Sequence, residues 1–151
     1  MLKPSVMGQF LDMPMDKFQI KKIKSAEIQD LVQIYKEAGW WKPSWEDSPD
    51  FLNYIVKDSA VFVGAFFDKK LIGMGRALSD LVSDAYIQDL AVLKQYRRQG
   101  IGKKIIQKLI RQLKTDNVDW IGVVAQPGTS RFYEKLGFEL LKDHTPLKFR
   151  N

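Results

Sequence analysis

The chain has 151 residues, of which 45% are hydrophobic and 28% charged, as expected for one globular domain that buries its own core. It contains no cysteine, which excludes disulfides, thiolate metal sites and a cysteine nucleophile and suits a reducing compartment. Its net charge of +6 is compatible with any anionic partner. Its apolar runs are too short for a signal peptide or a membrane span, so we expect a cytoplasmic protein.

The N-terminal part of the chain divides into an arm and the beginning of a domain. Residues 1–16 hold two prolines and four methionines without a clear period, which predicts an irregular arm ahead of a single domain at residues 17–151. Residues 18–23 have the composition of a first strand. Apolar residues then recur at helical spacing, with Ser25 as the expected N-cap and Gly39 as the stop.

The middle of the chain is predicted to form a loop and a short helix, followed by β-strands. Tryptophans and prolines at residues 39–50 predict an aromatic loop, and a short helix is expected at residues 51–57. Residues 60–67 and 71–78 are β-branched and aromatic runs joined by a three-residue connection, which predicts an antiparallel hairpin. A further strand is expected at residues 86–93.

The C-terminal third alternates a strong helix with shorter elements. From residue 101 to about residue 117, an apolar stripe lies opposite a row of lysines and arginines, which predicts an amphipathic helix. A buried strand is expected at residues 120–125 and a short helix at 130–135. Residues 138–141 and 147–149 are expected to close the sheet as an antiparallel pair, giving a mixed α/β fold.

The most informative window is the run Arg97-Arg98-Gln99-Gly100-Ile101-Gly102 between a predicted strand and the amphipathic helix. A helix start offers unpaired N–H groups and a partial positive charge, and glycine lets a phosphate approach the backbone. The run is neither a Walker loop nor a dinucleotide fingerprint, because no Gly-Lys-Ser/Thr follows and Ile105 occupies the third glycine position. From spacing alone, a tight turn with solvated arginines is the competing interpretation.

Two motifs resemble the GNAT superfamily of N-acetyltransferases. Arg97, Gly100 and Gly102 occupy the positions of its R/Q-x-x-G-x-G/A signature, and residues 130–138 are similar to its A-x-x-F-Y-x-x-x-G-F segment. The resemblance covers roughly residues 17–150 of the chain. It implies a mixed, mostly antiparallel twisted sheet flanked by helices and splayed between its two central parallel strands, where acetyl-CoA inserts.

The resemblance also implies a set of cofactor contacts from the first of the two central strands, at residues 86–93, from the signature loop and from the short helix. In the family, the backbone of this strand binds the pantetheine arm, and the loop binds the pyrophosphate. The residues carried over for acetyl-CoA are Leu90, Ala91, Val92, Arg97, Arg98, Gln99, Gly100, Ile101, Gly102, Lys103, Ser130 and Phe132. Where many members have an asparagine, this chain has Gln126-Pro127-Gly128, so that amide contact is not carried over.

Two residues are candidates for the acid and the base. The resemblance implies that Tyr133 protonates the departing thiolate. From the residues alone, the simpler interpretation is that Tyr133 is an aromatic core residue beside Phe132. Asp89 lies in an otherwise apolar strand just before the loop, a position suited to a general base. A structural carboxylate paired with an arginine such as Arg76 is an equally good interpretation, and a water chain would then serve as the base.

The aromatic loop supplies the candidates for binding the acceptor. Trp40 and Trp41 could pack the apolar part of an amine, and Glu46 could attract its charge, although all three could equally be ordinary surface or core residues. A glycine-tryptophan pair here is similar to acetyltransferases of the arylalkylamine type. His144 is the only histidine, so no metal site is expected.

The sequence therefore predicts an enzyme that moves an acetyl group from acetyl-CoA to a primary amine of a small molecule, by direct attack in a ternary complex. The alternative is a non-catalytic module that senses acyl-CoA or binds nucleic acid. Nucleic acid is disfavoured because the basic cluster surrounds a helix start and the tryptophans lie far from it in the sequence. No membrane partner is expected, and a homodimer is compatible with the sequence.

Overall fold

The computed structural model describes residues 17–151, so the predicted arm at residues 1–16 lies outside the described part. The strands are β1 (Gln19–Lys22), β2 (Val61–Phe67), β3 (Lys70–Ser79), β4 (Asp84–Val92) and β5 (Trp120–Val123). The α-helices are α2 (Ile28–Glu37), α3 (Leu52–Asp58), α4 (Ile101–Thr115) and α5 (Ser130–Glu134). Short 3-10 turns are η2 (Pro43–Trp45), η3 (Pro49–Phe51) and η4 (Lys94–Tyr96).

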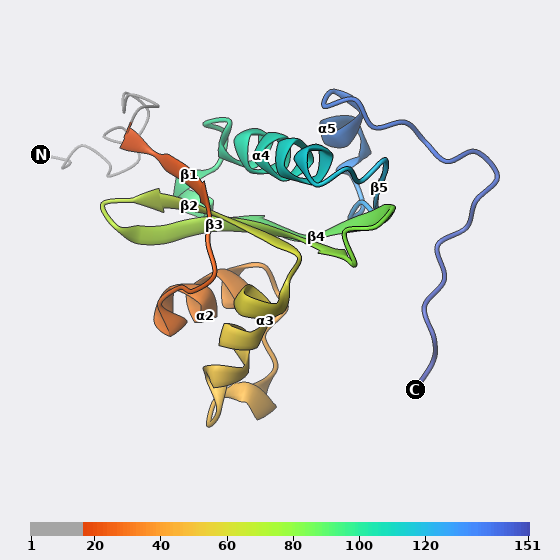
Figure 1. Cartoon of the computed structure of the whole chain (residues 1–151). Helices are drawn as coiled ribbons and strands as arrows, with labels where there is room; N and C mark the ends of the chain where they lie inside the picture. The colour runs from red at the N-terminus through yellow and green to blue at the C-terminus, as the bar shows by residue number, and fades with distance from the viewer. Residues whose placement is uncertain (1–16) are drawn as a thin grey trace, which may run out of the picture.

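The five strands form one sheet in the order β1-β2-β3-β4-β5. The neighbours β1 to β4 pair antiparallel, and only β4 and β5 run parallel. The parallel pair requires a crossover, which α4 provides between the two strands (Figure 1). The predicted mixed, mostly antiparallel sheet with two parallel strands is therefore confirmed.

Helices cover both faces of the sheet. In Figure 1, α4 lies on one face and α2 and α3 lie on the other. The predicted stripe of α4 packs onto the sheet, and its buried members are Ile101, Ile105, Ile106, Leu109 and Leu113. Gly75 of β3 lets this helix approach closely, because a Cβ there would lie only 2.8 Å from the side chain of Ile105.

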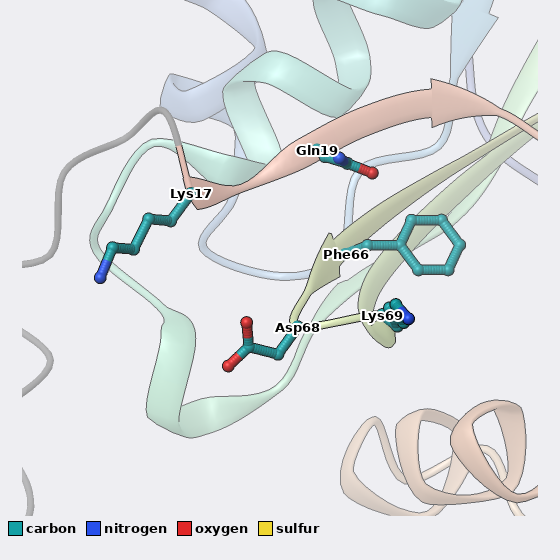
Figure 2. A pocket seen from close by; sticks show the side chains of 5 residues that line it. All are labelled: Lys17, Gln19, Phe66, Asp68 and Lys69. Carbon is teal, nitrogen blue, oxygen red and sulfur yellow. The ribbon is translucent and has the colours of Figure 1, made fainter.

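The hairpin between β2 and β3 is tighter than predicted. Only Asp68 and Lys69 separate the strands, with φ values of 46° and 66°. Two successive left-handed residues are typical of a type I′ turn, whose twist matches that of the flanking strands. A shallow hollow of about 220 Å³ lies beside this turn, and Figure 2 shows the side chains that line it: Lys17, Gln19, Phe66, Asp68 and Lys69.

Two predictions about local structure are wrong. Glu27, not Ser25, is the N-cap of α2, and no side chain caps this helix, although Gly39 follows the helix end in the left-handed conformation, as predicted for the stop. The expected closing pair of residues 138–141 and 147–149 does not form in the described chain. Gly137, with φ of 98°, instead leads the chain away from α5, and residues 139–151 are exposed.

Candidate active site

The parallel strands β4 and β5 separate part-way along the sheet. Their pairing runs from Asp84 opposite Trp120 to Ile87 opposite Val123, where β5 ends. β4 continues to Val92, so within residues 17–151 its last part has a strand partner only on the β3 side. The predicted backbone contacts, Leu90 to Val92, lie in this stretch. Peptide groups on the open side of this stretch are therefore available to an extended ligand arm.

A β-bulge marks the point where β4 turns from its partner. Arg76 pairs with Gln88, but the next paired positions are Met74 and Ala91, so β4 carries an extra residue here. Asp89 is in the left-handed region with φ of 54°, a conformation that aspartate tolerates better than most residues. Such bulges bend a strand and re-aim its side chains and peptide groups. This bulge immediately precedes the Leu90 to Val92 backbone.

Two side chains hold the carboxylate of Asp89, and a third side chain holds Arg76. The Nε of Arg76 donates to its Oδ2 at 2.6 Å, and the Tyr35 hydroxyl lies 3.5 Å from the same oxygen. The other side of Arg76 reaches the buried Ser59, whose Oγ is 3.5 Å from Nη1. Burial, followed by the negative charge of Asp89, raises the pKa of Tyr35 and keeps it protonated. Of the two interpretations of Asp89, the geometry matches the arginine-paired carboxylate.

Sequence reasoning named Arg76 as a partner but missed Tyr35. Tyr35 stands at a helical position of an apolar stripe and is indeed buried, so periodicity alone marks it as core. Only the tertiary packing of α2 against the sheet, chiefly against β3, brings its hydroxyl to Asp89.

The signature loop joins β4 to α4. The Nε of Arg97 donates to the carbonyl oxygen of Val92 at 2.9 Å, which fastens the loop to the strand that precedes it. Arg98 and Gly100 both adopt left-handed conformations, with φ of 61° and 77°. Gly100 is the N-cap of α4 and supplies no side-chain hydrogen bond to its first turn. The amide groups of that turn are therefore left for a ligand, as the predicted pyrophosphate site requires.

Positive side chains surround the start of α4. Arg97, Arg98, Lys103 and Lys104 are exposed, and no acidic residue lies in the first turn of the helix. The field at this helix end is therefore positive from both the side chains and the backbone. A polyphosphate fits both features.

The three predicted cofactor segments meet at Gly102. A Cβ built on Gly102 would lie 3.6 Å from the ring of Phe132 on α5 and 4.0 Å from the side chain of Leu90 on β4. The start of α4, the opened part of β4 and α5 therefore converge on one place. Ser130, also predicted to contact the cofactor, is exposed at the first position of α5.

Tyr133 is the candidate acid, and it is 9% exposed. Its ring packs edge-on against Phe132 and Phe138, with centroid distances of 5.0 and 5.6 Å. Burial raises the pKa of the Tyr133 hydroxyl above its ordinary value, so the proton stays on the oxygen near neutral pH. No residue of the described chain hydrogen-bonds this hydroxyl. The proton is therefore uncommitted to a structural role.

The acceptor candidates lie around the C-terminal end of α2. Trp40 packs edge-on against Tyr35 at 5.3 Å, which places it one side chain away from Asp89. The indole N–H of Trp41 donates to Glu46 at 2.8 Å, and Lys36 pairs with the other oxygen of Glu46 at 2.9 Å. The hydrogen bonds from Lys36 and then Trp41 hold the pKa of Glu46 below its ordinary value. Because Lys36 offsets its charge, Glu46 is poorly placed to attract a cationic amine.

Comparison with known proteins decides the family. The model of the acetyltransferase (GNAT) family matches residues 26–138. The chain belongs to the GNAT acetyltransferase family. It is therefore an acetyl-CoA-dependent N-acetyltransferase, and the predicted family, fold and enzyme class are confirmed.

Individual relatives agree with this assignment. The chain is 31% identical over 147 residues to an uncharacterized N-acetyltransferase, ycf52, of Pyropia yezoensis, covering 91% of this chain and 81% of that protein. It is 43% identical to GCN5-related N-acetyltransferase 2, chloroplastic, of Arabidopsis thaliana, but over only 72 residues, or 28% of that protein. A solved GNAT acetyltransferase of Streptococcus pneumoniae superposes with a TM-score of 0.71 at 26% identity, covering 89% of this chain and 98% of that one.

Two further features bear on partners. Among residues 17–151, no three histidine, aspartate or glutamate side chains are grouped so that they could hold a metal ion, and His144 is exposed with its Nδ1 2.8 Å from the Lys142 carbonyl oxygen. In the same part of the chain, every helix is too short or too polar to cross a membrane.

Proposed function

We propose that this acetyltransferase moves the acetyl group from acetyl-CoA to a primary amine of a small molecule, by direct attack within a ternary complex. One observation carries the proposal. The opening between β4 and β5, the uncapped start of α4 and the helix bearing Tyr133 converge within a few ångströms of Gly102. Such a site holds the pyrophosphate, the pantetheine arm and the thioester in one line.

The loop and strand bind and align the acetyl donor. The amides at the start of α4, with Arg98 and Lys103 beside them, hold the pyrophosphate. Apart from the Val92 carbonyl, which Arg97 already binds, the peptide groups of Leu90 to Val92 that face the opening hydrogen-bond the extended pantetheine arm. Both sets of contacts come from rigid elements, so the thioester carbonyl is fixed where the amine arrives.

The transfer proceeds without a covalent enzyme intermediate. The amine nitrogen attacks the thioester carbonyl, forming the C–N bond, and the C–S bond then breaks. The leaving sulfur takes a proton from the Tyr133 hydroxyl, which regains one from solvent. The chain has no cysteine to carry the acetyl group, which favours this direct route.

A water molecule, not Asp89, takes the proton released by the attacking amine. The carboxylate of Asp89 is occupied by Arg76 at 2.6 Å and lies beside the Tyr35 hydroxyl. An incoming amine would have to displace the guanidinium of Arg76 to reach this oxygen. Asp89 therefore shapes the bulge and leaves proton removal to solvent in the opening.

The acceptor binds through its apolar part. Trp40 and Trp41 supply aromatic surface at the end of α2, and a hollow of about 170 Å³ lies there, lined in part by Trp41 and Glu46. Because Lys36 neutralises Glu46, charge attraction contributes little, and an amine with an aromatic or aliphatic body is preferred over a small polar one.

An amine panel tests the proposal. Thiol release from acetyl-CoA is measured with arylalkylamines, polyamines, amino sugars and a lysine-containing peptide, and each product is identified by its added acetyl mass. We expect the highest kcat/KM with an aromatic or aliphatic amine, and intersecting initial-velocity lines when both substrates are varied. Acetylation of the peptide alone would contradict the acceptor class, and parallel lines would contradict direct attack.

A further inference from the structure

The last turn of α2 contacts the chain at both ends of the opened part of β4. The Tyr35 hydroxyl lies 3.5 Å from Oδ2 of Asp89, at the bulge. Two residues further along the helix, Oε2 of Glu37 accepts a hydrogen bond of 2.9 Å from the backbone N–H of Lys94. The stretch from Leu90 to Val92 lies between these two points. The Tyr35 contact belongs to the Asp89 network, whereas the Glu37 contact has no role in the site described above.

Lys94 is the first residue of η4, the short turn between β4 and the signature loop. The first amide groups of a helical turn find no acceptor within that turn. The N-cap residue of η4, Leu93, is apolar and supplies no side-chain hydrogen bond. Glu37 satisfies the first amide from another element and so acts as the cap that Leu93 cannot be. The bond therefore fixes where η4 begins.

The η4 turn sets the distance between two parts of the cofactor site. The turn is closed by a hydrogen bond of 2.9 Å from the Tyr96 N–H to the Leu93 carbonyl oxygen. The opened part of β4 lies before it, and the uncapped start of α4 lies after it. Acetyl-CoA has to reach the strand with its pantetheine arm and the helix start with its pyrophosphate at the same time. A turn that begins elsewhere would bring one set of contacts out of line with the other.

We propose that Glu37 is a positioning residue for acetyl-CoA, which acts through the Lys94 amide and holds η4 in the geometry that the cofactor requires. This role rests on the proposed cofactor site at the start of α4. Glu37 is partly buried, and Trp40 follows it closely, with its ring packed edge-on against Tyr35 at 5.3 Å. One helix end therefore supports the donor site and carries a candidate for the acceptor site.

The sign of the effect on affinity separates positioning from electrostatics. Glu37 is bonded to the turn that leads into the basic residues at the start of α4. Removing a negative charge from this place would strengthen the binding of a polyanion, because the repulsion between like charges is lost. Loss of positioning weakens the binding instead. A fall in affinity on removing the side chain of Glu37 therefore does not come from its charge.

Titration calorimetry of the full chain with acetyl-CoA is the first test. Glu37→Ala should raise the dissociation constant about tenfold, whereas Glu37→Gln, which keeps an acceptor oxygen without the charge, should stay within about threefold of the unmodified protein. Asp30→Ala is the matched control. Asp30 is a partly buried carboxylate of the same helix and accepts the backbone N–H of Leu71 at 3.0 Å, a strand residue that pairs with β2.

The control separates a positioning role from a structural one. Asp30→Ala should lower the melting temperature about as much as Glu37→Ala does and leave the affinity for acetyl-CoA unchanged. Unchanged or tighter binding by Glu37→Ala, or an equal loss of affinity in Asp30→Ala, would overturn the proposal. Failure of the cofactor site itself has a different signature, because Gly100→Ala would then also bind acetyl-CoA normally, and the site and the role of Glu37 would fall together.

Amide hydrogen exchange measured by NMR is the second test, and it reads the hydrogen bond itself. The Lys94 N–H should exchange slowly in the unmodified protein and in Glu37→Gln, and faster in Glu37→Ala. Binding of acetyl-CoA should slow the exchange in Glu37→Ala again, because the ligand selects the ordered turn. Equal exchange of this amide in all three proteins would mean that Glu37 does not hold η4, and the proposal would be refuted.

Discussion

Replacing Gly100 by alanine tests the pyrophosphate loop at its most constrained position. Gly100 is the N-cap of α4 with φ of 77°, and a Cβ there would meet no protein atom within 4 Å. The added methyl group therefore has no steric clash with the protein, and we expect it to enter the space that the pyrophosphate occupies. Left-handed backbone costs a non-glycine residue about 1 kcal/mol, so we expect the melting temperature to fall by about 2–4 °C.

The effect on the cofactor should be larger than the effect on stability. Displacing a phosphate from charge-assisted hydrogen bonds forfeits about 1.5–3 kcal/mol, which weakens acetyl-CoA binding by about 10- to 100-fold. Titration calorimetry measures the dissociation constant, and thermal unfolding measures the stability.

Gly39→Ala provides the matched control for this experiment. Gly39 has the same φ of 77° and no protein atom within 4 Å of its Cβ position, but it follows α2, outside the loop. It should lose the same stability and keep its affinity for acetyl-CoA. The reasoning is refuted if Gly100→Ala binds acetyl-CoA as well as the unmodified protein, or if the two variants lose affinity equally.

Three further outcomes are expected. Arg98→Ala and Lys103→Ala should each weaken acetyl-CoA binding severalfold in dilute buffer and by a smaller factor in concentrated salt. Titration calorimetry at two salt concentrations checks this. Unchanged affinity in both variants would mean that the basic residues at the start of α4 are only a solvated surface. Asp89→Asn breaks the pair with Arg76 and should lower the free energy of unfolding by about 2–4 kcal/mol in urea titrations. The shape of the pH–rate profile should stay the same, and loss of its acidic limb, where the rate rises with pH, would restore Asp89 as the base. Because burial raises the pKa of Tyr133 above its ordinary value, its acid form persists through the neutral and mildly alkaline range. Turnover should therefore rise with pH across this range as the amine deprotonates, and a fall in turnover within it in a folded enzyme would contradict this assignment.

Local patterns were sufficient to predict the elements that we propose bind the cofactor. The apolar stripe of α4 and the glycines before it are read within one window of sequence, and the structure places both as expected. The hairpin turn at Asp68 and Lys69 was harder, because neither residue is the glycine or asparagine that marks most type I′ turns.

Features that depend on distant strands could not be read from one window. The bulge at Asp89 is defined by the register of β4 against β3, and the Tyr35 contact depends on the packing of α2 against the sheet. The closing pair failed for a related reason, since the alternation at residues 147–149 predicts a strand without specifying its partner, and the described chain pairs no strand there.

The role of Tyr133 as the acid is the central chemical claim, and Tyr133→Phe tests it most directly. The change keeps the ring and its edge-on packing against Phe132 and Phe138. We expect turnover with a working amine to fall by about a hundredfold or somewhat less, because thiolate is already a good leaving group, while the dissociation constant of acetyl-CoA changes little. A folded Tyr133→Phe enzyme with unchanged turnover would contradict the account.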